Sequence, residues 1–323
     1  MPYELNSPLI VGVSSSALFD LSHENTIFET RGLDEYVKYQ IEHEKEILKP
    51  GPGFKLIKSL LQLNELVPEK RLVEVIIMSR NNANSSLRIF NSINHYNLDI
   101  IRAALTGGMP IKPYAEAFNI NLFLSTHVTD VQDAINSNIP SGLIYNTKSK
   151  YKESNEQIKL AFDGDAVIFS DESEKIYKRD GLEAFSNHEK TNALKPLPEG
   201  PFANFLRLIS QIQNEFPIDE CPIRTALVTA RSSPAHERVI RTLQAWDIKI
   251  DEVFFMGGVR KAEILKAFGA DIFFDDQHTH LKDSANVVPS ARVPYKNLSE
   301  QIELFEEGNK DQKIKNKQQD EKK

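Results

Sequence analysis

Residues 160–169 read LAFDGDAVIF and place two carboxylates, Asp163 and Asp165, one residue apart inside an apolar run. Burying two like charges costs free energy unless a cation or hydrogen-bond donors compensate them. We interpret residues 158–169 as a buried strand that carries this Asp-x-Asp pair at its carboxyl end. In open α/β sheets ligands bind at that edge, so the stretch predicts both a class of fold and the place of a site.

The rest of the chain repeats an alternation of strand and helix. Further short apolar runs, typical of buried strands, cover residues 8–13, 73–79, 122–125, 224–230, 252–256 and 271–276. Between them, apolar residues at three-to-four spacing predict helices over residues 54–66, 86–96, 202–216, 235–246 and 261–269. This alternation favours an α/β fold with a doubly wound, mainly parallel sheet and helices on both faces.

Composition narrows the class of protein. The 323 residues are 40% hydrophobic and 26% charged, and a net charge of −7 argues against binding to nucleic-acid polymers or anionic membranes. Cys221 is the single cysteine, which excludes an intrachain disulfide and a cysteine-based zinc site. The sequence shows no signal-peptide pattern and no apolar run approaching about 18 residues, so we expect a cytoplasmic protein. Residues 298–323 are mostly polar and are expected to be disordered.

The two halves of the chain resemble each other when one is moved by 150 positions. Residues 79–135 then align with 229–285 without a gap, and the Gly-Gly pair at 107–108 falls on the pair at 257–258. We therefore predict two similar α/β units, residues 1–150 and 151–297, which meet in a polar stretch near residue 150. The alternative, that any two doubly wound domains would align this well, stays open at this point.

Two carboxylates at a strand end suit a hard cation. Asp163 and Asp165 could hold Mg²⁺, which prefers oxygen ligands. With the ion bound, one carboxylate can attack phosphorus as a nucleophile while the other transfers protons. An EF-hand calcium loop is excluded because its third ligand position would be Val167 and its obligatory glycine would be Ile168.

Three later positions support a phosphate site. Thr229 ends a predicted strand, and its hydroxyl and the backbone N–H groups that follow could hold phosphate oxygens. Lys261 begins a predicted helix after a glycine turn, where it could neutralise phosphate charge. Asp275 and Asp276 end another strand and could complete the metal site. Alone, each is more typical of a helix cap, a surface lysine or a turn; their order along the chain is the signal.

This order resembles the haloacid dehalogenase superfamily of phosphohydrolases. More narrowly, the motifs AFDGDAVIFSDESE, VTARSS, GGVRK and FFDDQ, with MSRNN and FNSINHYNLDI in the first half, are similar to the cytosolic 5'-nucleotidase type I family. The resemblance covers residues 8–295. It implies a haloacid dehalogenase-like sheet with a small helical cap, and Mg²⁺-dependent hydrolysis of nucleoside 5'-monophosphates through an aspartyl-phosphate.

The resemblance also implies a role for each motif residue. Asp163 is expected to be the nucleophile and a Mg²⁺ ligand. Asp165 is expected to be the general acid and base and to bind the metal through its backbone carbonyl, and Lys261 to stabilise charge on the transferring group. The expected phosphate-binding residues are Gly164, Thr229 and Ala230, and the remaining metal ligands are Asp275 and Asp276. Val167 departs from the superfamily, in which many members carry Thr or Ser at this position.

The segment 171–221 lies between the first and second motifs, where the superfamily inserts its cap. Its aromatic residues Tyr177, Phe185 and Phe202, and also His188, are candidates for stacking on a nucleotide base. The alternative is that these side chains form the core of the cap itself.

The first half lacks the catalytic groups. In the aligned positions Ser14 and Ser16 replace the two aspartates, Ser79 replaces Thr229, and Ile111 replaces Lys261. Ser125 and Thr126 stand where the second half has Asp275 and Asp276. The polar residues that remain are Ser14, Ser15, Ser16, Ser79, Arg80, Asn81 and Asn82. We expect a degenerate, non-catalytic unit whose pocket is a candidate site for a regulatory nucleotide; a purely structural unit or a subunit contact in a homo-oligomer is the alternative.

Two other functions stay open. One is a phosphatase or phosphotransferase of the same superfamily that acts on another small phosphate ester. The other is a nucleotide-binding regulator without catalysis, which the intact second-half motifs disfavour. The sequence does not specify base, sugar, effector or oligomeric state.

Overall fold

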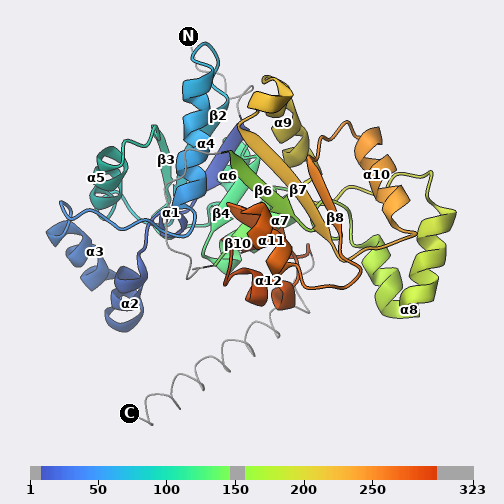
Figure 1. Ribbon diagram of the computed structural model, residues 1–323. Coiled ribbons are helices and arrows are strands. Elements are labelled where there is room, and N and C mark those ends of the chain that lie inside the picture. Colours follow the sequence, from blue (N-terminus) through green and yellow to red (C-terminus); the bar gives the residue numbers. More distant parts are fainter. Residues whose placement is uncertain (1–8, 146–156, 297–323) are drawn as a thin grey trace.

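The computed structural model describes residues 9–145 and 157–296, and its strands form one continuous sheet (Figure 1). The strands are β1 (Leu9–Val13), β2 (Val73–Ser79), β3 (Arg102–Leu105), β4 (Leu122–Ser125), β5 (Ser141–Ile144), β6 (Ile158–Phe162), β7 (Ile223–Thr229), β8 (Glu252–Phe255), β9 (Ile272–Asp275) and β10 (Ser290–Arg292). Their order across the sheet is β3-β2-β1-β4-β5-β10-β9-β6-β7-β8. The α/β class and the mainly parallel sheet are confirmed.

Each half of the sheet is parallel, and the two halves meet in an antiparallel pair. Strand β10 runs antiparallel to β5, with Ala291 opposite Ile144 and Arg292 opposite Leu143. Within each half the strands follow the same spatial order, third-second-first-fourth-fifth. Because the halves run in opposite directions, the carboxyl ends of β1–β4 and of β6–β9 lie at opposite edges of the sheet.

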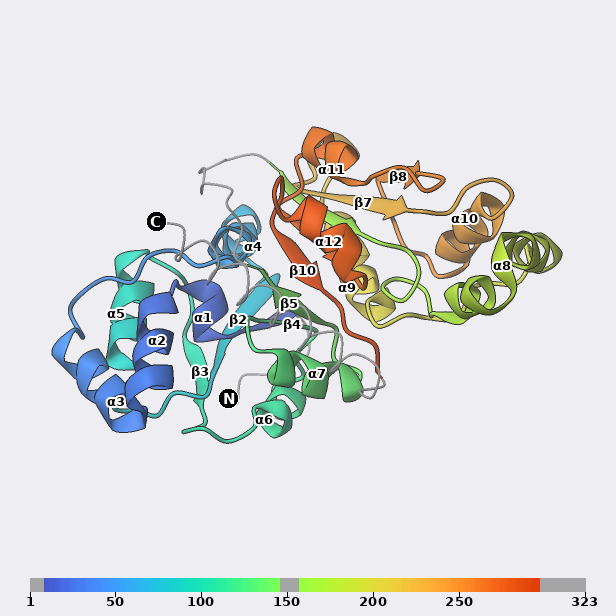
Figure 2. The ribbon, with the colours of Figure 1, turned by 90° about the horizontal axis from the view of Figure 1, so that it is seen from below.

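The helices cover both faces of each half. In the first half they are α1 (Ser15–Leu18), α2 (Ser22–Arg31), α3 (Leu33–Glu42), α4 (Phe54–Leu66), α5 (Leu87–His95), α6 (Lys112–Ala117) and α7 (Val128–Asn136). In the second half they are α8 (Glu172–Thr191), α9 (Ala203–Gln213), α10 (His236–Ala245), α11 (Ala262–Phe268) and α12 (His278–Ser284), with a 3-10 turn η1 (Ile218–Glu220). The α2–α3 pair and α8 lie at opposite ends of the molecule (Figure 2).

The largest hydrophobic cluster extends under both halves. It includes the buried faces of α4 and α5 in the first half and of α9 and α10 in the second, together with alternate residues of β1, β2, β6 and β7. Two smaller clusters on the other face lie under α6 and α7, and under α11 and α12. The halves therefore share one core on one face, and Lys55 adds an ion pair across them at 2.7 Å from Asp271.

Two helical hairpins correspond closely between the halves. Helices α2 and α3 meet at Gly32 (φ 86°, ψ −178°), and α8 bends into two arms at Gly181 (φ 83°, ψ −176°). This backbone region is open essentially to glycine alone. The shared strand order and shared bend support the internal repeat, although descent of the first half from a catalytic unit stays a prediction. The expected boundary near residue 150 and the tail 298–323 lie outside the described residues.

The structure corrects one boundary expected from the sequence. Strand β6 ends at Phe162, not at residue 169, because the chain turns back after Asp163: the N–H of Ile168 donates to the Gly164 carbonyl at 2.9 Å, and Ala166 has φ 60°. Within residues 171–221, α9 packs its apolar face into the core under the sheet, and α8 is the helix of this segment outside that core. The cap itself and its bounds stay a prediction.

Candidate active site

Asp163 is the first residue after β6 and is almost fully buried. Its N–H continues the sheet by donating to the Phe274 carbonyl at 2.8 Å. One carboxylate oxygen accepts from the Gly164 N–H at 2.7 Å, and the other lies 2.8 Å from Lys261 Nζ. The strand end therefore presents one carboxylate oxygen to a buried ammonium group.

Lys261 joins two carboxylates from different strands. Its Nζ lies 2.8 Å from Oδ2 of Asp163 and 2.8 Å from Oδ2 of Asp275, the last residue of β9. The lysine directly precedes α11 and follows a turn in which Gly257 and Gly258 have φ 55° and 87°. Burial alone would lower the pKa of Lys261, but the two carboxylates outweigh it and raise this pKa.

Negative charge exceeds positive charge around this cluster. Burial raises the pKa of Asp163 to about 7; Lys261 opposes the shift, and the charges of Asp275 and Asp165 add to it. Burial also acts to raise the pKa of Asp275, but Lys261 and His280 hold it below its usual range. The carboxylates would therefore gain from a further cation.

Asp276 carries the clearest sign of that missing charge. It is buried, and its Oδ1 has no hydrogen-bond partner in the described part of the chain, while Oδ2 accepts from the Tyr295 hydroxyl. Burial raises its pKa well above the usual value, with Asp275, Asp163 and Glu174 contributing. An unpartnered buried carboxylate oxygen fits a divalent cation nearby.

Ligand atoms of Asp163, Asp275 and His280 lie within 4.8 Å of one another. His280 stands in the first turn of α12, and its Nδ1 is 3.2 Å from Asp275 Oδ2. Sequence reasoning missed this histidine. Its position five residues after Asp275 was the available signal, since the helix that follows a strand end turns back over that end.

Asp165 faces a different cation from Asp163. Its two oxygens accept from Nε and Nη2 of Arg231 at 2.8 and 2.6 Å. Arg231 also donates to Glu189 of α8 at 2.5 Å. Each carboxylate of the Asp-x-Asp pair thus has its own buried cation. These two cations compensate the repulsion between the two neighbouring carboxylates. Arg231 was missed because no local pattern distinguishes it from a surface arginine.

The predicted phosphate-binding residues Thr229 and Gly164 lie together. Thr229 ends β7, and its hydroxyl oxygen accepts from the Arg231 N–H at 3.3 Å. A Cβ added at Gly164 would lie only 3.1 Å from that hydroxyl oxygen, so a side chain there would crowd it. Ala230 is exposed directly after β7, and its predicted role stays untested.

The aromatic candidates for base stacking lie in different surroundings in the structure, some on α8 and one in the core. Phe185 on the second arm of α8 lies over the Arg231 guanidinium, 5.4 Å from its ring centre, and Tyr177 meets Phe185 edge-on at 6.3 Å. Phe202 was wrongly included, because it is fully buried and packs 4.7 Å from the Phe274 ring. His188 lies 3.2 Å from an Arg238 nitrogen.

The first-half counterpart is a small pocket, in which Asn81 Nδ2 is buried without a hydrogen-bond partner among the described residues. Ser14, Ser15, Ser16, Ser79, Arg80 and Asn81 all line it, with a volume of about 40 Å³. Ser16 Oγ lies 2.6 Å from Thr126 Oγ1, and Arg80 Nε donates a hydrogen bond to Asp130 Oδ1 at 2.9 Å. Ligand pockets for small molecules are about ten times larger, so this pocket suits ordered water in the conformation seen. Nucleotide binding there stays a prediction.

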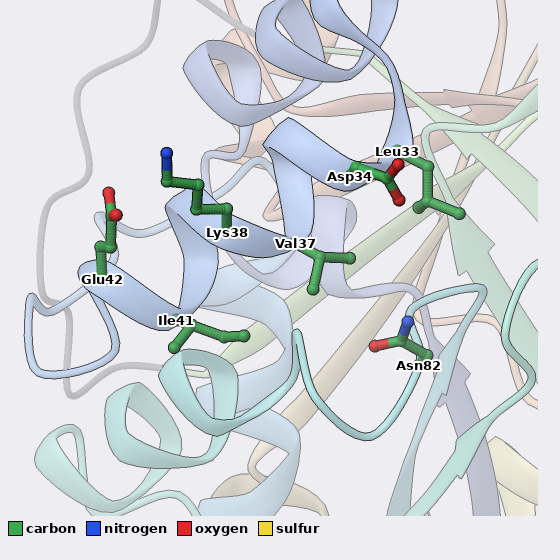
Figure 3. A pocket seen from close by; sticks show the side chains of 7 residues that line it. All are labelled: Leu33, Asp34, Val37, Lys38, Ile41, Glu42 and Asn82. Atoms are coloured by element: carbon green, nitrogen blue, oxygen red, sulfur yellow. The ribbon is translucent and has the colours of Figure 1, made fainter.

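A second hollow on the first half lies outside the predicted site. It has a volume of about 450 Å³ and is lined by Leu33, Asp34, Val37, Lys38, Ile41, Glu42 and Asn82 (Figure 3). Its aliphatic members come from α3 at every fourth position. Helix α3 lies at the opposite end of the molecule from α8 (Figure 2), whose Glu189 contacts Arg231 of the candidate active site.

Sequence comparison places the chain in a known family. A sequence model described as 5'-nucleotidase matches residues 1–300. Cytosolic 5'-nucleotidase 1B of Homo sapiens is 38% identical over 291 residues, which are 87% of this chain and 48% of that protein. The chain thus spans about half the length of this curated relative.

A solved chain from "Structure of Pnkp1/Rnl/Hen1 complex" covers 92% of this chain and 99% of its own length at 14% identity, and its TM-score of 0.32 carries no argument. Across residues 9–145 and 157–296, no helix has the length and apolar character needed to cross a membrane. From the match over residues 1–300, the chain belongs to the 5'-nucleotidase family.

Proposed function

We propose that this chain is a Mg²⁺-dependent phosphatase that converts nucleoside 5'-monophosphates to nucleoside and phosphate. The observation that carries the proposal is the buried cluster Asp163–Lys261–Asp275 beside the hydroxyl of Thr229. It joins a nucleophile, a fixed cation and a phosphate-binding hydroxyl at the carboxyl ends of three strands. Family membership and the relative named cytosolic 5'-nucleotidase 1B support this substrate class.

The acidic residues fit the metal that this activity implies. Asp163 and Asp275 would hold Mg²⁺, with Asp276, His280 and the backbone carbonyl of Asp165 as further candidates. When bound, the ion neutralises charge on the transferring phosphoryl group.

The side chains of this chain supply the remaining chemistry. Asp163 attacks phosphorus and the bond to the ester oxygen breaks, while Asp165 gives that oxygen its proton as the nucleoside leaves. Asp165 then removes a proton from water, whose oxygen attacks phosphorus, frees phosphate and restores Asp163. Lys261 offsets the charge that develops, and Thr229 with the Gly164 N–H orients phosphate oxygens.

We assign substrate selection to the cap. Phe185 and Tyr177 on α8 provide aromatic surface beside Arg231 and close to Asp165. They are the aromatic candidates that remain after Phe202 is excluded, and they suit the face of a base.

The test is phosphate release from common nucleoside monophosphates and from sugar phosphates, with Mg²⁺ or with a chelator. We expect release from nucleotides that needs the metal and that falls on the order of 10³-fold or more in Asp163→Asn. Asp180→Asn, an exposed aspartate of the cap, is the matched control. Release from sugar phosphates alone would favour the other phosphate-ester activity, and no turnover at all would favour the non-catalytic regulator. Cytoplasmic location and homo-oligomer formation stay predictions.

A further inference from the structure

A chain of buried ion pairs runs from the cap to Asp165. Asp165 binds Arg231 through both oxygens, and Arg231 donates to Glu189 at 2.5 Å. Glu189, on the second arm of α8, also accepts from Arg238 of α10 at 2.9 Å and from Ser173 at 2.8 Å. The side chains of Arg231, Glu189 and Arg238 are 2%, 0% and 5% exposed, so water does not screen these contacts.

The first half contains the same architecture and permits an internal comparison. Arg88 on α5 corresponds to Arg238 on α10, and the Nε of each donates to a carbonyl in the loop after its hairpin. These bonds are 2.9 Å to Glu46 and 3.0 Å to Lys195. The anchoring arginine is therefore present whether or not the half carries catalytic groups, which assigns Arg238 a structural role.

The other residues of this series of ion pairs are all replaced in the first half. Asp165, Arg231 and Glu189 correspond to Ser16, Asn81 and Gln40. A neutral path replaces the ionic one: Gln40 Nε2 donates to the Tyr36 hydroxyl at 3.0 Å, and that hydroxyl donates to Asn81 Oδ1 at 3.0 Å. In that half Arg88 takes its charge partner from Glu24 of α2, 2.6 Å away.

The first-half hairpin therefore folds onto its half with one buried glutamate–arginine pair, Glu24 with Arg88, and without an ionic counterpart of the Glu189–Arg231 contact. Glu189 and Arg231 occur in the half that has Asp165, and their neutral counterparts occur in the half that has Ser16. Both halves keep a carboxylate for the anchoring arginine, Glu24 for Arg88 and Glu189 for Arg238, but the ionic contact from the hairpin to the residue at position 231 has only a neutral counterpart in the first half. The pair is consequently connected with the carboxylate at position 165 and its chemistry.

We propose that Arg231 and Glu189 are positioning residues that orient the Asp165 carboxylate and couple its orientation to the place of the cap. A two-point contact fixes the plane of a carboxylate as a single hydrogen bond cannot. Glu189 fixes the guanidinium in turn, so movement of the second arm of α8 shifts Asp165. This inference rests on the proposed function, in which Asp165 exchanges protons with the ester oxygen and with water.

The decisive variant copies the neutral half. In a Ser173→Glu background, which gives Arg238 the carboxylate that Glu24 gives Arg88, Glu189→Gln with Arg231→Asn introduces the residue types found at the corresponding positions of the first half, whose hairpin folds with them. We expect an unchanged circular dichroism spectrum and a kcat for nucleoside monophosphates lowered on the order of 10²-fold, the scale of a misplaced general acid and base. Glu183→Gln, an exposed glutamate on the same arm, should stay within about twofold of the parent protein.

Two readouts separate positioning from a structural role. With p-nitrophenyl phosphate, whose leaving group needs no proton, the double variant should release about one p-nitrophenolate per site in a burst. Steady turnover should then be slow, because breakdown of the aspartyl-phosphate still needs Asp165. In an Asp165→Asn background the same two substitutions should cost less than about twofold further, because residues that act through one group are not additive.

Other outcomes would overturn the inference. The first is a kcat of the double variant within about twofold of the parent. The second is an equal loss of activity on both substrates without a burst. The third is a full further loss of activity in the Asp165→Asn background. If the double variant were unfolded, the anchoring argument would be wrong, and Arg231→Lys in the Asp165→Asn background would still test additivity. A parent protein that releases no phosphate would instead overturn the proposed function, and the inference with it.

Discussion

At the scale of single residues, charge compensation explains the candidate site. Lys261 contacts two buried carboxylates and Arg231 binds the half-buried carboxylate of Asp165, while Asp276 retains a buried oxygen without a partner in the described chain. Such an arrangement is costly in the metal-free protein and favourable once a cation is added, because buried like charges repel strongly.

Substitution of Lys261 tests whether its charge compensates the two buried carboxylates. Lys261→Met should lower the free energy of unfolding of metal-free protein by about 3–5 kcal/mol, because it leaves Asp163 and Asp275 buried without their cation. Urea unfolding with a chelator measures the effect. Lys175→Met removes a surface lysine that pairs with Asp171, and should cost less than about 1 kcal/mol. Equal costs for the two variants would contradict the charge argument.

The pKa of Asp163 gives a pH dependence with a definite sign. It is about 7 in the folded chain against 3.8 for an unperturbed aspartate, so folding favours the protonated form. The contribution of this group to stability is complete below about pH 4 and is lost as pH rises toward 7. Mg²⁺ should therefore raise the Tm of the protein more at pH 8 than at pH 5, as differential scanning fluorimetry can measure.

The control for this prediction is Asp163→Asn, in which the pH-dependent part of the Mg²⁺ effect should shrink. A Tm shift on Mg²⁺ addition that is the same at both pH values in the parent protein would contradict the assignment of Asp163 as a ligand.

At the scale of elements, the two hairpins show how a glycine sets the angle between two helical arms. Gly32 and Gly181 adopt nearly identical dihedral angles, and a Cβ at either would meet nothing within 4 Å. The cost of a side chain is therefore one of backbone strain alone. Because α8 contacts Arg231 with one arm and Gln277 with the other, its bend sets where the cap meets the site.

Matched substitutions at these bends separate stability from catalysis. Gly181→Ala and Gly32→Ala should each lower the free energy of unfolding by about 1–3 kcal/mol, since both impose the same backbone strain. Gly181→Ala should also raise KM for the nucleotide several-fold, whereas Gly32→Ala should leave KM unchanged. Urea unfolding and steady-state kinetics on both variants provide the measurement. A similar KM change in both would argue against α8 as the substrate-selecting element.

At the scale of the whole molecule, the shared core predicts cooperative unfolding. One hydrophobic cluster includes residues of both halves, and β5 pairs with β10 across them. Thermal unfolding should consequently give a single transition with equal calorimetric and van't Hoff enthalpies. Two separate transitions in differential scanning calorimetry would show that the halves are independent domains.

A substitution at the junction of β5 and β10 tests the shared core. Gly142 on β5 has no room for a side chain, because an added Cβ would lie 2.9 Å from the Ala291 Cβ. Gly142→Ala should lower the Tm of the whole protein by several degrees, through overpacking of about 1–3 kcal/mol. Loss of stability in one half alone would contradict the shared core.

Most of the candidate site was predictable because its residues follow strands or begin helices. Asp163, Thr229, Lys261 and Asp275 stand at such points, and parallel strands bring those points together. Arg231 and Glu189 were not predictable, since their roles depend on contacts between elements far apart in the chain. Phe202 was placed wrongly because a buried aromatic side chain and a stacking one look alike in a sequence.

The sequence by itself determined the α/β class and the repeat of the strand–helix pattern, and it indicated the residues that we propose to handle phosphate, because apolar spacing and residue type are local properties. It missed the short strands β3, β5 and β10, each with four residues or fewer. The tertiary structure decided the antiparallel junction of β5 and β10 and the single core. It also decided that the candidate active site and its first-half counterpart lie at opposite edges of the sheet. Strand pairing is made by backbone hydrogen bonds, which are common to all residues except proline and therefore leave little trace in the side chains.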